Sequence, residues 1–374
     1  MTTNRRRAVL RDVAELASVS IKTASRVLNN DPAVAEPTRA AVVRAMEALD
    51  YQPDPAARSL RAGKDRMVGV VIDSVGDVFF SRMVARIESV LNAAGYLALI
   101  ASSNRNEQAE RDVVQAFVQR RCAGIIVAPI TPASLHGLGL RDTPIVFVDR
   151  IGDLPQTPSV VSDDYGFGWR AAEHLIRHGH RRIALISDTP SLATTRLRQD
   201  GFRAAMTAGN LPIDERHMQT NCEERGEVLR AINYLLHLDQ PPTALISTNT
   251  RLSLGVVPAL HQYRRTDVGL ISIGDFDMAA SLSPGVTVID HSPEALGEEA
   301  STTLLRQLSQ SGAAPQETLI TVPAQLIPRG SGEVLMGSLA SHGLNEEDPG
   351  ESMSTTTQHS VGALAHTPLR GDVS

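Results

Sequence analysis

Aromatic residues and cysteines are scarce in this chain. Only 3% of its 374 residues are aromatic, and it holds two cysteines. Cys122 and Cys222 lie far apart and lack the spacing of metal ligands, so we expect two ordinary buried thiols. The composition therefore predicts neither a disulfide framework nor a metal site, and we expect no cofactor.

Long hydrophobic runs are also missing from the sequence. No apolar run approaches the roughly 18 residues that a membrane-spanning helix needs. Three arginines at positions 5–7 could begin a targeting peptide, but the polar Arg11 and Asp12 follow too soon for its apolar region. We therefore expect a cytoplasmic protein without a membrane contact.

The charge of the chain is unevenly distributed. Its formal net charge is -6, yet residues 1–66 hold 12 basic and 8 acidic side chains. The rest of the chain is acidic. A basic head on an acidic body indicates a polyanionic partner for the head, such as nucleic acid.

Short helical patterns fill residues 10–50. Apolar residues recur at helical spacing from Leu10 to Ala17 and again from Ile21 to Leu28, with a polar break between them. A third helix is predicted from Glu36-Pro37, because proline suits a first helical turn. Its expected apolar side is Val42, Val43, Met46 and Leu49. No strand pattern precedes residue 66.

Apolar strands alternate with amphipathic helices from residue 67 onwards, which predicts an α/β body with parallel sheets covered by helices. About nine strands suit two lobes better than one. The expected strands are Met67–Asp73, Leu97–Ala101, Gly124–Pro129, Ile145–Asp149, Arg182–Ser187, Thr243–Ser247, Val268–Ile273, Val286–Ile289 and Thr318–Val322. The expected helices cover about 80–94, 106–121, 168–178, 195–208, 224–237 and 293–310. Residues 336–374 lack periodicity and are expected to be a disordered tail.

The stretch from Leu10 to Asn29 is the most specific motif in the sequence. It predicts two short helices joined by a three-residue turn and packed through Val13, Ala14, Val19 and Val27. Ser20 is a favourable N-cap for the second helix. This arrangement leaves the start of the second helix free to enter a DNA groove. The side chains expected to face that groove are Ile21, Lys22, Thr23, Ser25 and Arg26.

This stretch closely resembles the DNA-binding head of the lactose-repressor family. The family pattern D-V-A-x-x-A-x-V-S-x-x-T-x-S-R-V-L-N is matched from Asp12 to Asn29. Ser18 stands where the family usually has glycine. The turn there is expected to need a positive φ, so Ser18 should carry a small strain.

The resemblance implies roles for individual residues in DNA recognition. Ile21 and Lys22 occupy the variable positions that read bases, and a lysine can donate to guanine O6 or N7. Thr23, Ser25, Arg26 and Asn29 match more constant positions that contact phosphates and base edges.

The segment that begins at Tyr51 is similar to the hinge of the same family. The hinge pattern Y-x-P-x-x-x-A-x-x-L is matched at Tyr51, Pro53, Ala57 and Leu60. A helix this short is not stable alone, so it should fold only when paired on DNA. The resemblance places Ala57 and Leu60 among the DNA-binding residues, with Leu60 as a wedge in the minor groove. A leucine at a helix end is otherwise most often a core residue.

The resemblance continues to about residue 332 and implies the whole architecture. The expected fold is α/β, with an all-α helix-turn-helix head, a hinge helix and a two-lobed body of two doubly wound parallel sheets like a periplasmic binding protein. The expected domains are the head at 1–50, the hinge at 51–65 and an effector-binding and dimerisation body at 66–335. Lobe 1 is expected at about 66–162 and 292–322, and lobe 2 at about 163–291 and 323–335.

Polar residues that follow strands are the candidate effector ligands, because open parallel sheets bind ligands at the carboxyl ends of their strands. Carboxylates, guanidinium groups and amides together suit a polyol such as a sugar. Phe79 and Phe80 offer aromatic faces for a sugar or purine. The candidates that match effector positions of the family are Asp149, Arg198, Asn249, Asp277 and His291.

Several of these residues have alternative structural interpretations. Asp149 can form an ion pair with Arg150, while Asp277 and Asn249 can each cap a helix. A pair of histidines at 178 and 180 is typical of a surface turn, and Trp169 of packing. Thr250 and Leu192 depart from the usual family residues, so the effector is not identified.

The sequence favours a transcriptional regulator, most simply a repressor, that binds a palindromic operator as a homodimer under the control of a small molecule, with a carbohydrate favoured. It would be associated with the nucleoid when bound to DNA. An extracytoplasmic sugar-binding protein would share the body but lack the head. An α/β enzyme is disfavoured because no nucleophile elbow, P-loop or dinucleotide fingerprint follows a strand. Whether the effector releases DNA or strengthens its binding stays open.

Overall fold

The computed structural model describes residues 8–28, 31–51, 66–140, 142–309 and 317–334. The predicted DNA contacts Asn29, Ala57 and Leu60, and the predicted tail at 336–374, lie outside these residues. Within the described part, no helix is long and apolar enough to cross a membrane.

The head consists of three helices around one small core, as predicted. They are α1 (Leu10–Leu16), α2 (Ile21–Leu28) and α3 (Glu36–Ala48). The buried core residues are Val13, Ala14, Ala24, Val27, Val42 and Ala45, and Val19 packs against them. One expectation for α3 was wrong: Val43 is 42% exposed, and Ala45 is buried instead. A side chain next to Val42 lies about 100° around the helix from it, so Val43 turns away from the core.

The turn between α1 and α2 has the geometry that the sequence predicts. The hydroxyl of Ser20 accepts a hydrogen bond from the backbone N–H of Thr23, at 3.1 Å, and so caps α2. Ser18 has φ of 54°, in the left-handed region that favours glycine. The strain expected at Ser18 is therefore present.

Replacing Ser18 by glycine should stabilise the head. Glycine adopts φ of 54° without a Cβ clash, and relief of this strain is worth up to about 1 kcal/mol. Hydrogen exchange of the α1 and α2 amides in the full chain would measure the gain as slower exchange. The matched control is Ser20→Ala, which removes the cap and should speed the same exchange. Faster exchange in Ser18→Gly would contradict the assignment of strain.

The body contains two six-stranded sheets. The lobe 1 sheet has the order β11-β5-β4-β3-β1-β2, and the lobe 2 sheet the order β12-β10-β9-β8-β6-β7. The strands of lobe 1 are β1 (Met67–Ile72), β2 (Leu97–Ser102), β3 (Gly124–Val127), β4 (Ile145–Val148), β5 (Ser159–Ser162) and β11 (Leu319–Val322). Those of lobe 2 are β6 (Ile183–Ile186), β7 (Met218–Gln219), β8 (Ala244–Ser247), β9 (Gly269–Ile273), β10 (Thr287–Asp290) and β12 (Gln325–Ile327).

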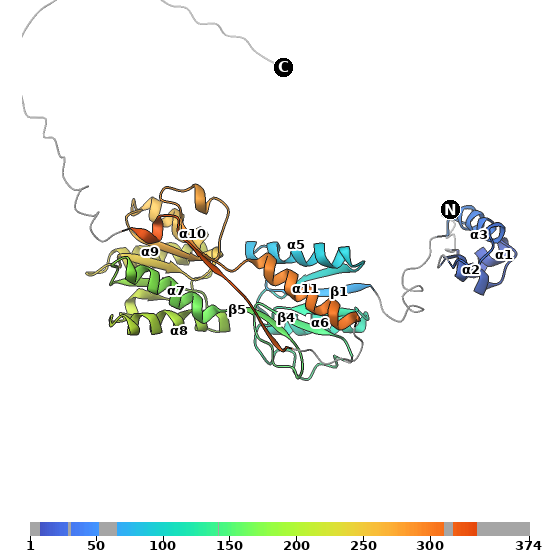
Figure 1. Ribbon diagram of the computed structural model, residues 1–374, viewed down its shortest axis with the longest axis horizontal. Coiled ribbons are helices and arrows are strands. Elements are labelled where there is room, and N and C mark those ends of the chain that lie inside the picture. Colours follow the sequence, from blue (N-terminus) through green and yellow to red (C-terminus); the bar gives the residue numbers. More distant parts are fainter. Residues whose placement is uncertain (1–7, 29–30, 52–65, 141, 310–316, 335–374) are drawn as a thin grey trace, which may run out of the picture. The chain divides into compact units, whose positions relative to one another are not determined.

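Helices cover both sheets. In lobe 1, α5 and α11 lie side by side although they are far apart in sequence (Figure 1). The helices of lobe 1 are α5 (Val78–Ala93), α6 (Glu107–Gln119) and α11 (Pro293–Ser309). Those of lobe 2 are α7 (Asp164–Arg177), α8 (Ala193–Ala208), α9 (Arg225–Leu236) and α10 (Thr250–Gln262). Single 3-10 turns are η1 (Glu215–His217), η2 (Ala279–Ser281) and η3 (Ser331–Glu333).

The chain passes between the two lobes three times. It leaves lobe 1 between β5 and α7, returns between β10 and α11, and leaves again between β11 and β12. The last passage is the long segment between the lobes in Figure 1. Each lobe is therefore built from separated stretches of the chain.

All nine predicted strands are present, but the sequence missed three short ones and one helix. The missed elements are β5, β7, β12 and α10. In α10 the helical pattern is obscured by Gly255 and by Pro258, which lies inside the helix. β12 is also antiparallel to β10, so the lobe 2 sheet is not purely parallel as expected.

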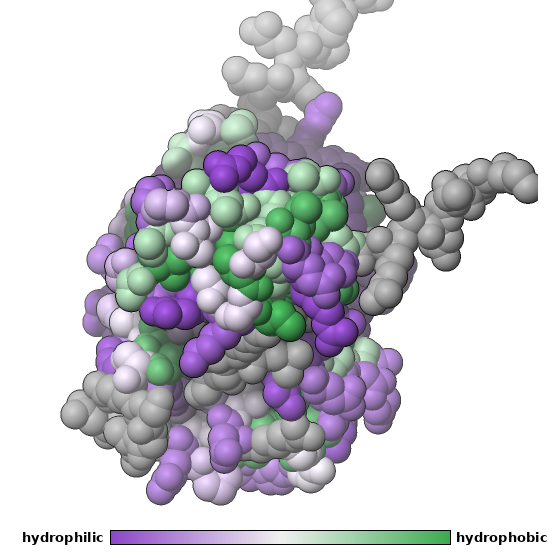
Figure 2. Space-filling view, turned by 90° about the vertical axis from the view of Figure 1, so that its right-hand side faces the viewer, coloured by the Kyte–Doolittle hydropathy of each residue, from purple (hydrophilic) through white to green (hydrophobic). Residues whose placement is uncertain are grey.

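The hydrophobic cores lie on both faces of each sheet. Each face has its own cluster of buried aliphatic and aromatic residues. Trp169 packs against one of them, which agrees with its predicted packing role. Some large apolar side chains stay exposed, including Leu97 and Met278. Figure 2 shows one face, where hydrophobic residues lie directly beside hydrophilic ones.

Candidate functional site

A cleft opens at the carboxyl ends of the strands, between lobe 1 and lobe 2. Its space, counted to the open mouth and including open solvent, is about 510 Å³. Side chains of both lobes contribute to its walls. The lining residues are Asp73, Asp77, Phe79, Phe80, Arg105, Asp149, Arg150, Asp188, Leu192, Thr194, Thr195, Arg198, Asn249, Thr250, Arg251 and His291.

Asp149 is the most strongly perturbed carboxyl group of the cleft. It follows β4 directly and has φ of 68°, an uncommon conformation for a residue other than glycine. Burial raises its pKa from the usual 3.8 to about 6, and the nearby Arg150 guanidinium opposes this shift. The two side chains are 3.4 Å apart, so the predicted ion pair with Arg150 is present within the cleft. A buried carboxylate of this kind is a candidate acceptor for ligand hydroxyls.

Arg198 projects into the cleft from α8 and is fixed by two partners. Its Nε donates to Asp164 Oδ1 at 2.7 Å, its Nη2 forms an ion pair with the same oxygen at 2.6 Å, and its Nη1 donates to the Thr248 carbonyl at 2.5 Å. Asp164 is buried at the start of α7, and burial raises its pKa against the opposing charge of Arg198. The guanidinium is therefore held in one orientation before any ligand binds.

Two glycines allow α7 and α8 to approach closely enough for this pairing. A Cβ on Gly168 would lie 1.9 Å from the carbonyl oxygen of Arg198. A Cβ on Gly201 would lie 1.9 Å from the carbonyl oxygen of Tyr165. Only glycine fits at either point, because any side chain would overlap the backbone of the opposite helix.

His291 lies at the base of the cleft, after β10. Its ring centre is 4.9 Å from that of Phe79 and 5.3 Å from that of Phe167. Burial, followed by the charges of Arg198 and Arg82, lowers its pKa well below the usual 6.5, so the ring is neutral. Its Nδ1 is buried without a hydrogen-bond partner in the described structure. A buried polar atom beside an open cleft is a candidate ligand contact.

The capping interpretation of Asn249 is confirmed, and the residue also lines the cleft. Its Oδ1 accepts from the backbone N–H of Leu252 at 2.9 Å, so the side chain caps α10. Its Nδ2 donates to Asp188 at 3.4 Å, and the residue lines the cleft. The cap fixes the amide, which leaves little freedom for it to reorient toward a ligand.

Asp277 requires a correction, because it does not line the cleft. β9 ends at Ile273, and Gly274 then turns the chain with φ of 96°. Asp275 forms a bidentate pair with Arg329 at 2.7 and 2.6 Å, whereas Asp277 is exposed. Gly274 packs against a residue that does line the cleft, because a Cβ on it would lie 2.3 Å from Thr250 Oγ1. Because the chain turns at Gly274, Asp277 does not reach the cleft, although it follows a strand in the sequence.

The histidines of the turn before β6 have structural roles. His178 and His180 flank Gly179, which has φ of 90°. His180 Nδ1 lies 3.0 Å from Thr243 Oγ1. In the described part of the chain, no group of three or more His, Cys, Asp or Glu residues could hold a metal ion.

In the head, the predicted groove-facing residues lie at the start and along the outer side of α2. Ile21 and Lys22 are exposed, while Thr23 and Ser25 are half-buried. Arg26 Nε donates to Asp31 at 2.7 Å, and both side chains remain partly exposed. The α2 start therefore presents an apolar and a cationic side chain together.

Comparisons with known proteins agree for both parts of the chain. Residues 9–54 match the family model described as "Bacterial regulatory proteins, lacI family". Residues 65–328 match that described as "Periplasmic binding proteins and sugar binding domain of LacI family". The chain belongs to the lacI family.

Relatives of this lacI-family chain include named regulators. It is 32% identical over 272 residues to the transcriptional regulator GalR of Escherichia coli, covering 72% of this chain and 79% of GalR. It is 28% identical over 326 residues to the transcriptional repressor PurR of Glaesserella parasuis, covering 86% and 96%. A Lac repressor dimer bound to operator and an anti-inducer superposes with a TM-score of 0.76 at 25% identity, covering 88% and 100%.

This lacI-family chain is thus a DNA-binding transcriptional regulator with an effector-binding body, and not an enzyme. Six of the seven predicted effector residues line one cleft, and Asp277 is the exception. The sequence analysis missed Asp73, Asp188, Arg105 and Arg251. Asp73 and Asp188 end or follow predicted strands, so the same rule could have found them.

Proposed function

We propose that the cleft of this regulator is its effector site and that α2 reads the operator. The observation that carries the effector site is the unpartnered buried Nδ1 of His291, a residue that lines the same cleft as Asp149 and Arg198. The effector residues are Phe79, Phe80, Asp149, Arg198, Asn249 and His291. We retain the domain limits predicted above, with the head at 1–50, the hinge at 51–65 and the body at 66–335.

We propose an uncharged polyol, such as a saccharide, as the effector. The guanidinium groups that line the cleft are already paired: Arg150 with Asp73, Arg198 with Asp164, and both Arg105 and Arg251 with Asp188. A phosphate or carboxylate would need an unpaired cation. Hydroxyls instead suit Asp149 and His291 Nδ1, and the matched family model names a sugar-binding domain.

We propose that Ile21 and Lys22 set the operator preference, with Thr23, Ser25, Arg26 and Asn29 holding the head on DNA. Ala57 and Leu60 would complete the contact from the hinge. Two chains would bind a palindrome as a homodimer, as the Lac repressor dimer binds its operator. The protein would act in the cytoplasm, on the nucleoid when it is bound to an operator.

Replacing Lys22 should change which operator is preferred. Lys22 is exposed at the first turn of α2, and a direct base contact is worth about 1–3 kcal/mol of discrimination, roughly 5–150-fold. Selection of bound sequences from a random DNA pool would compare Lys22→Ala with the wild type. The matched control is Arg44→Ala, an exposed arginine of α3, which should keep the preferred sequence. If Lys22→Ala selects the same consensus sequence as the wild type, Lys22 does not determine the operator preference.

One experiment tests the proposed function as a whole. The consensus sequence from the random pool serves as the operator. The affinity of the protein for this DNA is then measured in the presence of neutral saccharides and of their phosphate esters. We expect a neutral saccharide to change operator affinity by about 5–150-fold, a typical allosteric coupling. A response confined to phosphate esters would contradict the proposed effector class.

A further inference from the structure

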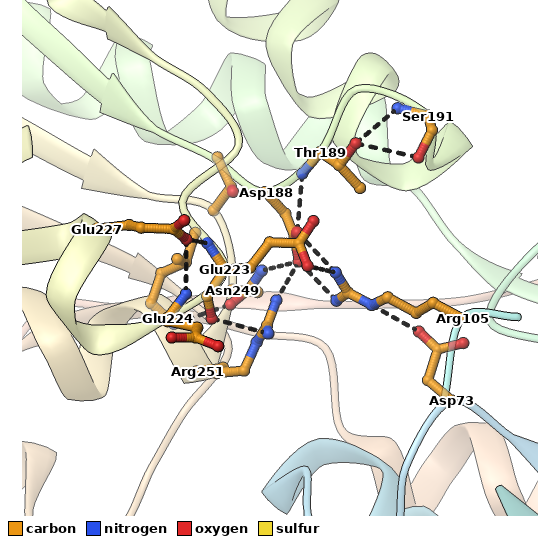
Figure 3. A network of polar contacts seen from close by, with 12 residues as sticks. Asp73, Arg105, Asp188, Thr189, Ser191, Glu223, Glu224, Glu227, Asn249 and Arg251 are labelled. Atoms are coloured by element: carbon orange, nitrogen blue, oxygen red, sulfur yellow. Dashed lines mark hydrogen bonds and ion pairs between the residues drawn. The ribbon is translucent and has the colours of Figure 1, made fainter. Parts of the chain in front are cut away.

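A network of ion pairs that lines the cleft connects the two lobes (Figure 3). Arg105 follows β2 in lobe 1, and Asp188 follows β6 in lobe 2. The Arg105 guanidinium donates through Nη1 and Nη2 to the two carboxylate oxygens of Asp188, each at 2.8 Å. This parallel geometry is the strongest common form of an ion pair.

Asp188 has further donors from its own lobe. Arg251 Nη2 donates to it at 2.5 Å, the backbone N–H of Thr189 at 2.8 Å and Asn249 Nδ2 at 3.4 Å. Its side chain is only 3% exposed. Burial alone would raise the pKa of Asp188, but Arg105 and Arg251 outweigh it and the pKa is lowered. The carboxylate is therefore fixed in lobe 2, whether or not Arg105 reaches it.

Arg105 is also fixed within its own lobe. Its Nε lies 3.6 Å from Asp73, the carboxylate that binds Arg150 beneath it. Two successive residues before α6, Asn104 and Arg105, have φ of 49° and 58°. A left-handed backbone is unfavourable at a non-glycine residue such as Arg105, and such strain is often found at functional sites. From this turn the Arg105 side chain reaches Asp188 in the other lobe.

We infer that the Arg105–Asp188 pair is an interlobe latch that holds the cleft closed before any effector binds. This inference rests on the proposed effector cleft for its regulatory meaning. An effector that bridges both lobes binds the closed form, and its apparent affinity is proportional to the closed fraction. The latch would then keep effector affinity high, because little of the binding energy is spent on closing the lobes.

The test measures closure without an effector. Cysteines are introduced in the full chain at two exposed positions, Gln119 of lobe 1 and Gln262 of lobe 2, and are spin-labelled. Double electron–electron resonance then measures the distance between the lobes. The native Cys122 and Cys222 are buried. When labelled chain is diluted with excess unlabelled chain, most labelled dimers carry one labelled chain, and we expect a single narrow distance in wild type. In Arg105→Ala we expect a second distance, with the closed-to-open ratio about tenfold lower.

Matched variants separate the latch from a general loss of an ion pair. Arg203→Ala removes a bidentate pair with Glu215 inside lobe 2 and should keep the wild-type distance. Arg105→Lys should keep part of the closed form, since lysine can still bind Asp188 at one point. If Arg105→Ala does not fold, Arg105→Gln keeps most of the side-chain length and serves in its place.

The same distance distribution in Arg105→Ala and wild type would overturn the latch, as would a wild type that is largely open. Neither result would affect the effector site, because no effector is present in this measurement. Conversely, a saccharide screen without a response would overturn the effector site and leave the measured closure unchanged.

Discussion

Replacing Arg198 by methionine is expected to abolish the effector response and to destabilise the protein by about 3–5 kcal/mol. The response is lost because the guanidinium faces the cleft from α8. The stability is lost because Asp164, which is 4% exposed, would keep a buried carboxylate without its partner. Operator affinity and thermal unfolding of the full chain would measure the two effects.

A second substitution separates these two effects. Arg198→Met combined with Asp164→Asn removes both charges and should recover most of the lost stability, because replacing both partners of a buried pair is often neutral. It should not recover the response. A single or double variant that still responds to the saccharide would make Arg198 a purely structural residue.

Arg203→Ala is the matched control for Arg198. Arg203 also lies on α8 and forms a bidentate pair with Glu215, but this pair is largely exposed. Exposed pairs contribute about 0–1 kcal/mol, so the control should keep both stability and response.

Replacing Asp149 by asparagine should stabilise the protein while it removes the effector response. The pKa of about 6 means that the folded protein holds the proton more tightly than the unfolded chain, where the pKa is about 3.8. Keeping the carboxylate ionised at pH 7.5 therefore costs on the order of 3 kcal/mol. Asparagine removes this cost, and it tolerates φ of 68° well. Denaturant unfolding would measure the gain.

The same pKa predicts how effector binding depends on pH. If effector hydroxyls bind the ionised Asp149, affinity falls as pH drops through about 6, and it should be about tenfold weaker at pH 5 than at pH 7.5. The effect of pH on folding has the opposite sign. Because the pKa of Asp149 is higher in the folded state, protonation of Asp149 stabilises the fold most below pH 3.8, and this stabilisation is lost as pH rises through 6.

Asp112→Asn is the control for Asp149, because this exposed carboxylate of α6 should affect neither stability nor response. An Asp149→Asn variant that is less stable than wild type at pH 7.5 would contradict the assigned cost of ionisation. Unchanged effector affinity in Asp149→Asn would show that Asp149 pairs with Arg150 but does not bind the effector.

Much of the fold could be predicted from local patterns, because a buried strand requires a run of apolar residues. β5 was missed because Ser159 and Ser162 leave only two valines between them, too few for a pattern. β12 was missed for a similar reason, since Gln325 begins its three residues. These strands form because neighbouring strands bind them, which is a tertiary effect that no short stretch of sequence records.

The lining of the candidate cleft was predictable where one rule sufficed, namely that ligands of open parallel sheets bind at the carboxyl ends of the strands. Asp149 and His291 follow this rule directly. Asp277 failed because the left-handed turn at Gly274 changes the register after the strand. The contact of Arg105 with Asp188 could not be predicted, because it depends on the distance between the two lobes, which no local sequence pattern determines.

The interleaved course of the chain has a consequence for its synthesis on the ribosome. The core of lobe 1 includes Leu296, Ala300 and Leu304 of α11 and Val322 of β11, all made after most of lobe 2. The part of lobe 1 from β1 to β5, which emerges first, must therefore wait with apolar surface uncovered until α11 and β11 arrive. Such a nascent chain is prone to aggregate, and a chaperone that shields it during this delay should raise the yield of folded regulator.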